Sequence, residues 1–208
     1  MSAARPLDTL AAPEQRAQAG TLGMWVFLAT ELMFFGPLFF GYWYGRLQFP
    51  DAFAAASRET DVVLGAANTA LLLTSSALMA AAVEAAQLGA RRIAVRLLGA
   101  TAALGVVFLV VKGVEYHHEW QAGLFPGDAS VLVTGGRLFF LLYFAMTGVH
   151  ALHLVIGITV VAAFAVAGAG AKPRWGPGQL GLVGLYWHFV DALWIFLFPL
   201  LYLLGRSG

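Results

Sequence analysis

Carboxylic acids lie deep inside apolar stretches of the sequence, where an ionisable side chain costs at least a few kcal/mol. Glu31 comes about nine residues into the first stretch, a helical rise of roughly 14 Å, which predicts a position near the middle of a bilayer. A carboxyl there either exchanges protons or binds a lipid head group, or it makes a hydrogen bond that fixes helix packing. Both interpretations stay open.

The last apolar stretch carries a second acid with a histidine beside it. Asp191 lies near the middle of this stretch, and His188 is one turn earlier on the same helix face, so the two can share a proton. Trp187 and Trp194 flank the pair, and a polar notch of this kind must face protein rather than lipid. The pattern predicts part of a proton or ligand site, or a hydrogen-bonded clasp to an adjacent helix or subunit.

His150 and His153 are three residues apart and share a face of another apolar stretch. Two histidines on one helix suggest a metal or haem. A b-type haem, however, needs axial ligands from facing helices, and a helical zinc site normally places its pair at i, i+4 with a glutamate between. Since neither pattern is present, we expect histidines that hydrogen-bond between helices and no metal bound by this chain.

Lys112 and Glu115 are also three residues apart, near the end of the third apolar stretch. The spacing predicts an intrahelical ion pair or two side chains that reach to water, and a proton-linked role for Glu115 is the alternative. The polar and aromatic residues 116–120 that follow are typical of a membrane–water boundary.

The composition excludes a soluble protein. The chain has 208 residues, of which 60% are hydrophobic and 11% charged, with a mean hydropathy of +0.78. The absence of cysteine excludes disulfides, iron–sulfur clusters, cysteine-bound copper and covalent c-type haem. A net charge of +1 without a block of like charges gives no basis for nucleic-acid binding.

Five apolar runs are each long enough to cross a hydrocarbon core of roughly 30 Å. They cover residues 22–45, 62–88, 93–118, 137–168 and 179–204. The sequence therefore predicts an all-α, polytopic membrane bundle of about five transmembrane helices. We expect a polar N-terminal tail at 1–20, a single transmembrane domain at 21–205, and a tight helical hairpin at the basic turn near Gly89.

The basic residues predict an orientation. If the helices alternate, the tail, the turn at 89–96 and the linker at 169–178 lie on one side of the membrane. That side holds Arg5, Arg16, Arg91, Arg92, Arg96, Lys172 and Arg174, whereas most loop acids lie on the other. We therefore expect a cytoplasmic N-terminus and a C-terminus outside.

Two motifs resemble a known family, subunit III of the haem–copper terminal oxidases. Residues 186–194 (YWHFVDALW) look like the final-helix signature of that family, and 147–153 (TGVHALH) look like its second strong motif. Weaker matches follow in the expected order at 25–35, 68–76 and 112–116. The resemblance covers the chain from the first predicted helix to the last.

The resemblance implies a subunit of cytochrome c oxidase without redox centres, packed in a bacterial inner membrane against subunit I, which holds the haems and copper. It also implies structural phospholipid, support of proton uptake in aerobic electron transport, and protection of the active centre. Glu31 would be the buried carboxylate of the helix that faces subunit I, and Asp191 with His188 would belong to the final-helix motif. Lys172 and Arg174 would meet lipid phosphates.

Alternatives to this assignment stay open. Longer family members have two further helices at the N-terminus, so we expect a lipid cleft that lacks one wall or is completed by another subunit. A quinol oxidase subunit III and a nitric-oxide-reductase accessory protein share the five-helix form, and the electron donor is undetermined. From another class, a proton channel or transporter would use Glu31, Asp191 and the histidines as a relay.

Overall fold

The computed structural model describes residues 13–126, 134–170 and 175–206, and these are helical almost throughout. The helices are α1 (Pro13–Gln48), α2 (Pro50–Glu59), α3 (Val62–Gln87), α4 (Arg91–Gln121), α5 (Thr134–Ala169), α6 (Pro177–Phe198) and the π-helix η1 (Pro199–Leu203). Five segments are long and apolar enough to cross a membrane, at 18–48, 62–87, 91–121, 134–169 and 177–203. The predicted all-α architecture with five spans is confirmed.

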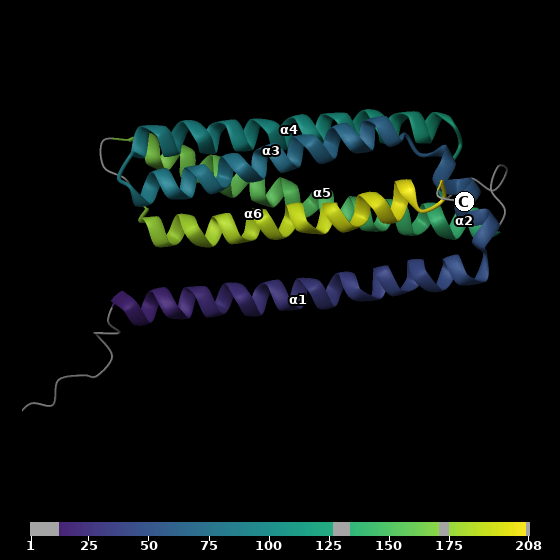
Figure 1. Cartoon of the computed structure of the whole chain (residues 1–208), viewed down its shortest axis with the longest axis horizontal. Coiled ribbons are helices and arrows are strands. Elements are labelled where there is room, and N and C mark those ends of the chain that lie inside the picture. Colours follow the sequence, from purple (N-terminus) through teal and green to yellow (C-terminus); the bar gives the residue numbers. More distant parts are fainter. Residues whose placement is uncertain (1–12, 127–133, 171–174, 207–208) are drawn as a thin grey trace, which may run out of the picture.

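Helices α3 to α6 form a bundle, and α1 runs along one side of it (Figure 1). The start of α1, the α3–α4 turn, the end of α5 and the start of α6 lie at one end, whereas α2 and the C-terminus lie at the other. Successive spans therefore alternate in direction, as the predicted orientation assumes. Residues 1–12 of the expected tail lie outside the described residues, and α1 already begins at Pro13.

The turn between α3 and α4 explains the tight hairpin that the sequence predicts. Gly89 has a φ of +75°, a conformation that L side chains rarely adopt. Its N–H donates to the carbonyl of Ala86 at 3.2 Å, and the N–H of Ala90 donates to the carbonyl of Ala85 at 2.8 Å. This pair of bonds is a Schellman motif, which ends a helix and reverses the chain within a few residues.

Helix α1 contacts the bundle through a narrow stripe. Leu28, Phe35 and Tyr42 are its buried hydrophobic side chains, spaced seven residues apart, and much of the rest of the helix surface is exposed and apolar. A spacing of seven keeps a single seam against a neighbouring helix. The opposite faces of α1 are left for lipid or for another protein.

A short helix, α2, covers one end of the bundle where the sequence analysis expected no element. Pro50 at its first turn and Asp51 beside it are typical of a helix start. Phe53 is buried and packs edge-on against Tyr42 and Phe139, with ring centroids 5.4 and 5.6 Å apart. This aromatic contact joins α2 to α1 and α5.

The chain ends in a π-helical turn that begins at Pro199, which has no N–H to donate. The carbonyl oxygens of this turn accept bonds from neighbouring side chains. The hydroxyl of Tyr42 donates to Leu200 at 2.6 Å, and that of Ser57 donates to Leu201 at 2.8 Å. The turn is thus tied to α1 and α2, and it carries Tyr202 into the core.

Candidate functional site: buried polar groups between the helices

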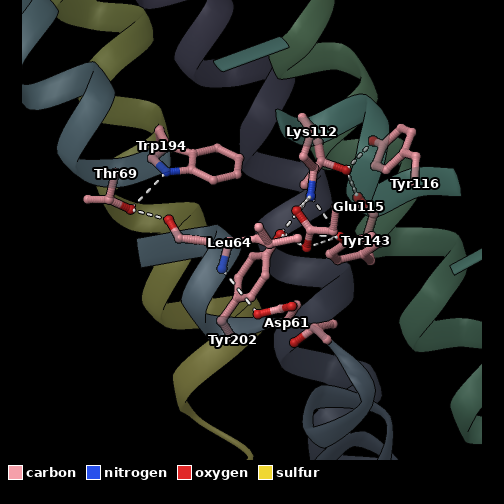
Figure 2. Close-up of polar contacts among 12 residues, drawn as sticks. Asp61, Leu64, Thr69, Lys112, Glu115, Tyr116, Tyr143, Trp194 and Tyr202 are labelled. Atoms are coloured by element: carbon pink, nitrogen blue, oxygen red, sulfur yellow. Dashed lines mark hydrogen bonds and ion pairs between the residues drawn. The ribbon is translucent and has the colours of Figure 1, made fainter. Parts of the chain in front are cut away.

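Four side chains from three elements form a buried polar cluster (Figure 2). Lys112 and Glu115 come from α4, Tyr143 from α5 and Tyr202 from η1. The Nζ of Lys112 donates to Glu115 Oε2 at 3.0 Å and to the hydroxyls of Tyr143 and Tyr202, each at 2.6 Å. We name this set the Lys112 cluster.

The donors and acceptors of the Lys112 cluster match one to one. The three N–H groups of an ammonium go to three acceptors, and the two tyrosine hydroxyls donate to Glu115 Oε1 at 2.9 and 2.6 Å. Lys112 Nζ also lies 4.5 Å from the centre of the Tyr143 ring, close enough for a cation–π contact. The cluster is a closed set of charge-assisted hydrogen bonds that ties α4, α5 and η1 together.

The predicted ion pair of Lys112 and Glu115 is therefore present, but the alternative in which the two side chains reach water is wrong. Their side chains are 3% and 2% exposed. Sequence reasoning missed Tyr143 and Tyr202, because hydrophobic context gives no signal that a tyrosine hydroxyl faces an ion pair. It also assigned Glu119 to the membrane boundary, although its i, i+4 spacing from Glu115 puts it on the buried face.

Glu31 bonds to one of the predicted histidines. Its Oε2 lies 2.9 Å from Nε2 of His153, and Nδ1 of His153 lies 2.8 Å from the carbonyl of Val149. Because a carbonyl oxygen can only accept, Nδ1 carries a hydrogen. The remaining contact holds one proton, which sits either on Glu31 or on Nε2 of His153. The sequence could not pair these two residues, which lie on different helices.

The second predicted histidine has a different environment. His150 is fully buried and packs against the rings of Phe108 and Trp194, with centroids 5.7 and 5.1 Å away. Neither ring nitrogen has a hydrogen-bond partner among the described residues. The expectation of hydrogen-bonded interhelical histidines thus fits His153 and differs from the structure at His150.

His188 and Asp191 do not bond to each other within the described structure. Nδ1 of His188 lies 2.7 Å from the hydroxyl of Ser76 on α3. Asp191 is 3% exposed and interacts with Ser76 only at a looser geometry than a hydrogen bond, so both carboxylate oxygens lack a partner in the described part of the chain. His188 and Asp191 therefore do not share a proton as expected, and both lie next to the same residue, Ser76.

The remaining expectations concern metals and lipids. Among residues 13–126, 134–170 and 175–206, no group of three or more histidine or acidic side chains is arranged to hold a metal ion. Lys172 and Arg174, the expected contacts for lipid phosphates, lie outside the described residues.

A family model for cytochrome c oxidase subunit III matches residues 14–206, which is nearly the whole chain. The chain belongs to this family. The match confirms the resemblance carried by the motifs at 147–153 and 186–194, and with it the assignment to subunit III of the haem–copper oxidases.

Individual relatives agree with the family match. Cytochrome c oxidase subunit 3 of Alkalihalophilus pseudofirmus is 30% identical, over 90% of this chain and 87% of the relative. Cytochrome bo(3) ubiquinol oxidase subunit 3 of Pseudomonas aeruginosa is 28% identical, over 88% of this chain and 84% of the relative. A heme-copper oxidase subunit I+III of Aeropyrum pernix is 30% identical over 86% of this chain, which spans only 22% of that longer protein.

Proposed function

We propose that this chain is the non-catalytic third subunit of a bacterial cytochrome c oxidase complex and packs against subunit I through the exposed apolar faces of α1. The observation that carries the proposal is the burial of α1. Only 6% of its most apolar window is buried within the chain, and Trp25, Met33 and Phe40 are 58%, 77% and 70% exposed. The relative that fuses subunits I and III in one chain supports this choice of partner.

The redox chemistry belongs to the partner in this proposal. Haem and copper would be held by subunit I, the partner that the fused subunit I+III relative suggests. The chain is then a component of a proton-translocating oxidoreductase without carrying out electron transfer itself. Structural phospholipid would fill apolar grooves such as the one between α1 and α6, lined by Phe39, Phe189 and Phe196.

The pair of Glu31 and His153 gives this chain its own part in proton uptake. The contact holds a single proton between two groups that both accept one, and it joins α1 to α5 inside the predicted membrane region. A proton can move between the two without any change in helix packing. We assign a proton-buffering role to this pair, next to the face proposed to contact subunit I.

The orientation and location complete the proposal. Arg91, Arg92 and Arg96 lie at the α3–α4 turn, on the same end of the bundle as the start of α1. The positive-inside rule then puts that end in the cytoplasm and the C-terminus outside a bacterial inner membrane. Electron donors are of two kinds among the relatives, since some are named as cytochrome c oxidase and others as quinol oxidase subunits.

Purification of the full chain from native membranes in mild detergent tests this proposal. We expect a haem-bearing catalytic subunit to be recovered with it, recognised by its absorption spectrum and by mass spectrometry. Recovery with a nitric oxide reductase would show that the partner of this chain is that enzyme and not an oxidase. A colourless chain without partners would overturn the proposal and favour a stand-alone channel or transporter.

A matched pair of variants tests the role of α1. Met33→Trp enlarges an exposed side chain of α1, and Leu73→Trp does the same at an exposed position, 51% exposed, in the middle of α3. We expect Met33→Trp to reduce recovery of the catalytic subunit several-fold and Leu73→Trp to leave it unchanged. Equal recovery with both variants would contradict the assignment of α1 as the contact face.

A further inference from the structure

A chamber of about 210 Å³ lies at the end of the bundle that carries α2 and the C-terminus. Glu59, Asp61 and His118 line it and are themselves exposed, whereas Glu115 and Glu119 line it from buried positions. At roughly 30 Å³ per water molecule, the chamber has room for several. It therefore leads from exposed acidic residues to two buried carboxyl groups.

Glu119 is the unexplained member of this group. The residue is 4% exposed, and Tyr143 interacts with it only at a looser geometry than a hydrogen bond, so both carboxylate oxygens lack a partner among the described residues. It also lies in the last turn of α4, where the helix dipole opposes a negative charge. An unpaired carboxylate in such a place is costly, so a proton or a cation must accompany it.

Two other acids of the chamber, Asp61 and Glu115, already have partners. Asp61 caps α3, and its Oδ1 accepts the N–H groups of Val63 and Leu64 at 2.9 and 3.1 Å. Glu115 accepts three donors within the Lys112 cluster. Among the buried acids that line this chamber, Glu119 is therefore the one with both oxygens free, within the described residues.

A single proton fits this site better than a metal ion. The part of the chain that the structure describes contains no group of three histidine or acidic side chains placed to ligate a metal, and both oxygens of Glu115 and Oδ1 of Asp61 already accept hydrogen bonds. Charged and titratable groups face Glu119 from several elements, and they are Lys112, Glu115, Tyr116 and His118 on α4, Tyr143 on α5, Tyr202 on η1, and Glu59 and Asp61 across the chamber.

We propose that Glu119 exchanges a proton with water in this chamber, so that the chain carries a proton-exchange site at the membrane face of α2 and the C-terminus. In the uptake step, an O–H bond of a hydronium ion breaks, the proton bonds to a carboxylate oxygen of Glu119, and a neutral water molecule remains. The Lys112 cluster stays closed during this step, since its hydrogen bonds are complete without Glu119. The site rests on this chain's own residues and not on the proposed partner.

Infrared difference spectroscopy on the full chain in lipid nanodiscs tests the site. A carboxyl C=O band should grow when the bulk pH is lowered, and it should shift quickly when D₂O replaces water, because the chamber admits solvent. Glu119→Gln should remove this band. The variant should fold, because Tyr143 interacts with the Glu119 side chain only at a looser geometry than a hydrogen bond, and the amide keeps the size and an acceptor oxygen of the carboxyl group.

Two control variants identify the band. Glu84→Gln removes an exposed acid near the opposite end of α3 and should leave the band intact. Asp191→Asn removes another buried acid without a hydrogen-bond partner in the described structure, one that does not line the chamber, and it should also leave the fast-exchanging band. Persistence of that band in folded Glu119→Gln would overturn the proposal. So would a band that follows Na⁺, Ca²⁺ or Mg²⁺ at constant pH, since a cation would then occupy the site.

Discussion

Helices α1 and α6 are equally apolar but have opposite places in the fold. Both spans have a mean hydropathy of 1.6 over their most apolar window, yet 6% of that window is buried in α1 and 56% in α6. In a membrane, an apolar side chain is as stable against lipid tails as against protein. Hydropathy therefore determines that a helix lies in the membrane, but not where it lies in the bundle. Side-chain shape and polar contacts determine the position of a helix in the bundle.

The side chains of α6 show how this choice is made. Trp187 is fully buried beside two glycines, and a Cβ on Gly105 would lie 3.0 Å and one on Gly157 3.3 Å from its ring. Its indole N–H donates to Ser75 of α3 at 3.2 Å. In α1, by contrast, Trp25 is 58% exposed and Met33 77%. Helix α6 therefore contacts the other helices of this chain on most of its surface, whereas most of the α1 surface contacts no other part of the chain.

The largest effect on stability is expected from disrupting the Lys112 cluster, in which Tyr202 of η1, directly after α6, bonds to Lys112 and Glu115 of α4. Lys112→Met removes the ammonium group that donates to Glu115 and to both tyrosine hydroxyls, so the buried carboxylate keeps the tyrosine donors but loses its cation. The variant should lower the free energy of unfolding by about 3–5 kcal/mol. Unfolding by SDS in mixed micelles measures this. Replacing Glu115 by Leu in the same chain should recover part of the loss. If Lys112→Met alone changes the free energy of unfolding by less than about 1 kcal/mol, which is on the order of one surface ion pair, the cluster does not stabilise the fold as proposed.

The two tryptophans provide the sharpest direct test of the comparison. Trp187→Ala should lower the free energy of unfolding by about 2–4 kcal/mol, because it leaves a cavity between α4, α5 and α6. Trp25→Ala should change it by less than about 0.5 kcal/mol. Both are measured on the isolated chain in the same micelles. Similar losses for the two would mean that α1 is more important to this fold than its burial indicates.

A smaller effect is expected where α1 meets α5. Glu31→Gln replaces a charge-capable contact to His153 by a weaker one and should lower the free energy of unfolding by about 1 kcal/mol. In the assembled oxidase it should also reduce turnover or shorten the time before inactivation, with the haem spectrum intact. Glu84→Gln is the control. Unchanged kinetics with Glu31→Gln would show that Glu31 and His153 contribute to helix packing and not to proton uptake.

The smallest effect is expected at Asp191, within the well-packed helix. Its carboxyl has no hydrogen bond in the described structure and is 3% exposed, so another subunit cannot reach it directly. Asp191→Asn should change the free energy of unfolding by less than about 0.5 kcal/mol, and recovery of the catalytic subunit should not change. Weaker recovery with an unchanged fold would restore the alternative of a clasp between subunits.

The sequence predicted the spans well, because length and hydropathy act locally. The predicted runs at 62–88 and 179–204 agree with the structural spans at 62–87 and 177–203 within two residues. Helix α2 was missed because its ten residues are few and of mixed polarity, and the search for apolar runs long enough to cross a membrane passes over such a segment, although Pro50 at its start was visible. The hairpin at Gly89 was found from a single local feature.

Among the buried polar groups, the sequence predicted one pair correctly, Lys112 with Glu115 on α4, and no partner on another helix. Their types and depth marked Glu31, His153 and Glu115 as costly, and all three are engaged. Their side-chain partners on other elements lie 28 to 122 residues away along the chain, a separation that no spacing rule covers. The expected contact of His188 with Asp191 obeyed such a rule, but in the folded chain Ser76 of α3 bonds to His188 instead.

By itself the sequence determined that this chain is a bundle of five membrane helices, because each run of apolar residues must satisfy its own backbone hydrogen bonds in lipid. It also fixed which ionisable groups had to find partners. Tertiary structure alone decided that two tyrosines join the pair of Lys112 and Glu115, that Glu119 faces a chamber, and that α1 stays at the edge. Those outcomes depend on which helix faces meet, and side chains from distant segments set that geometry together.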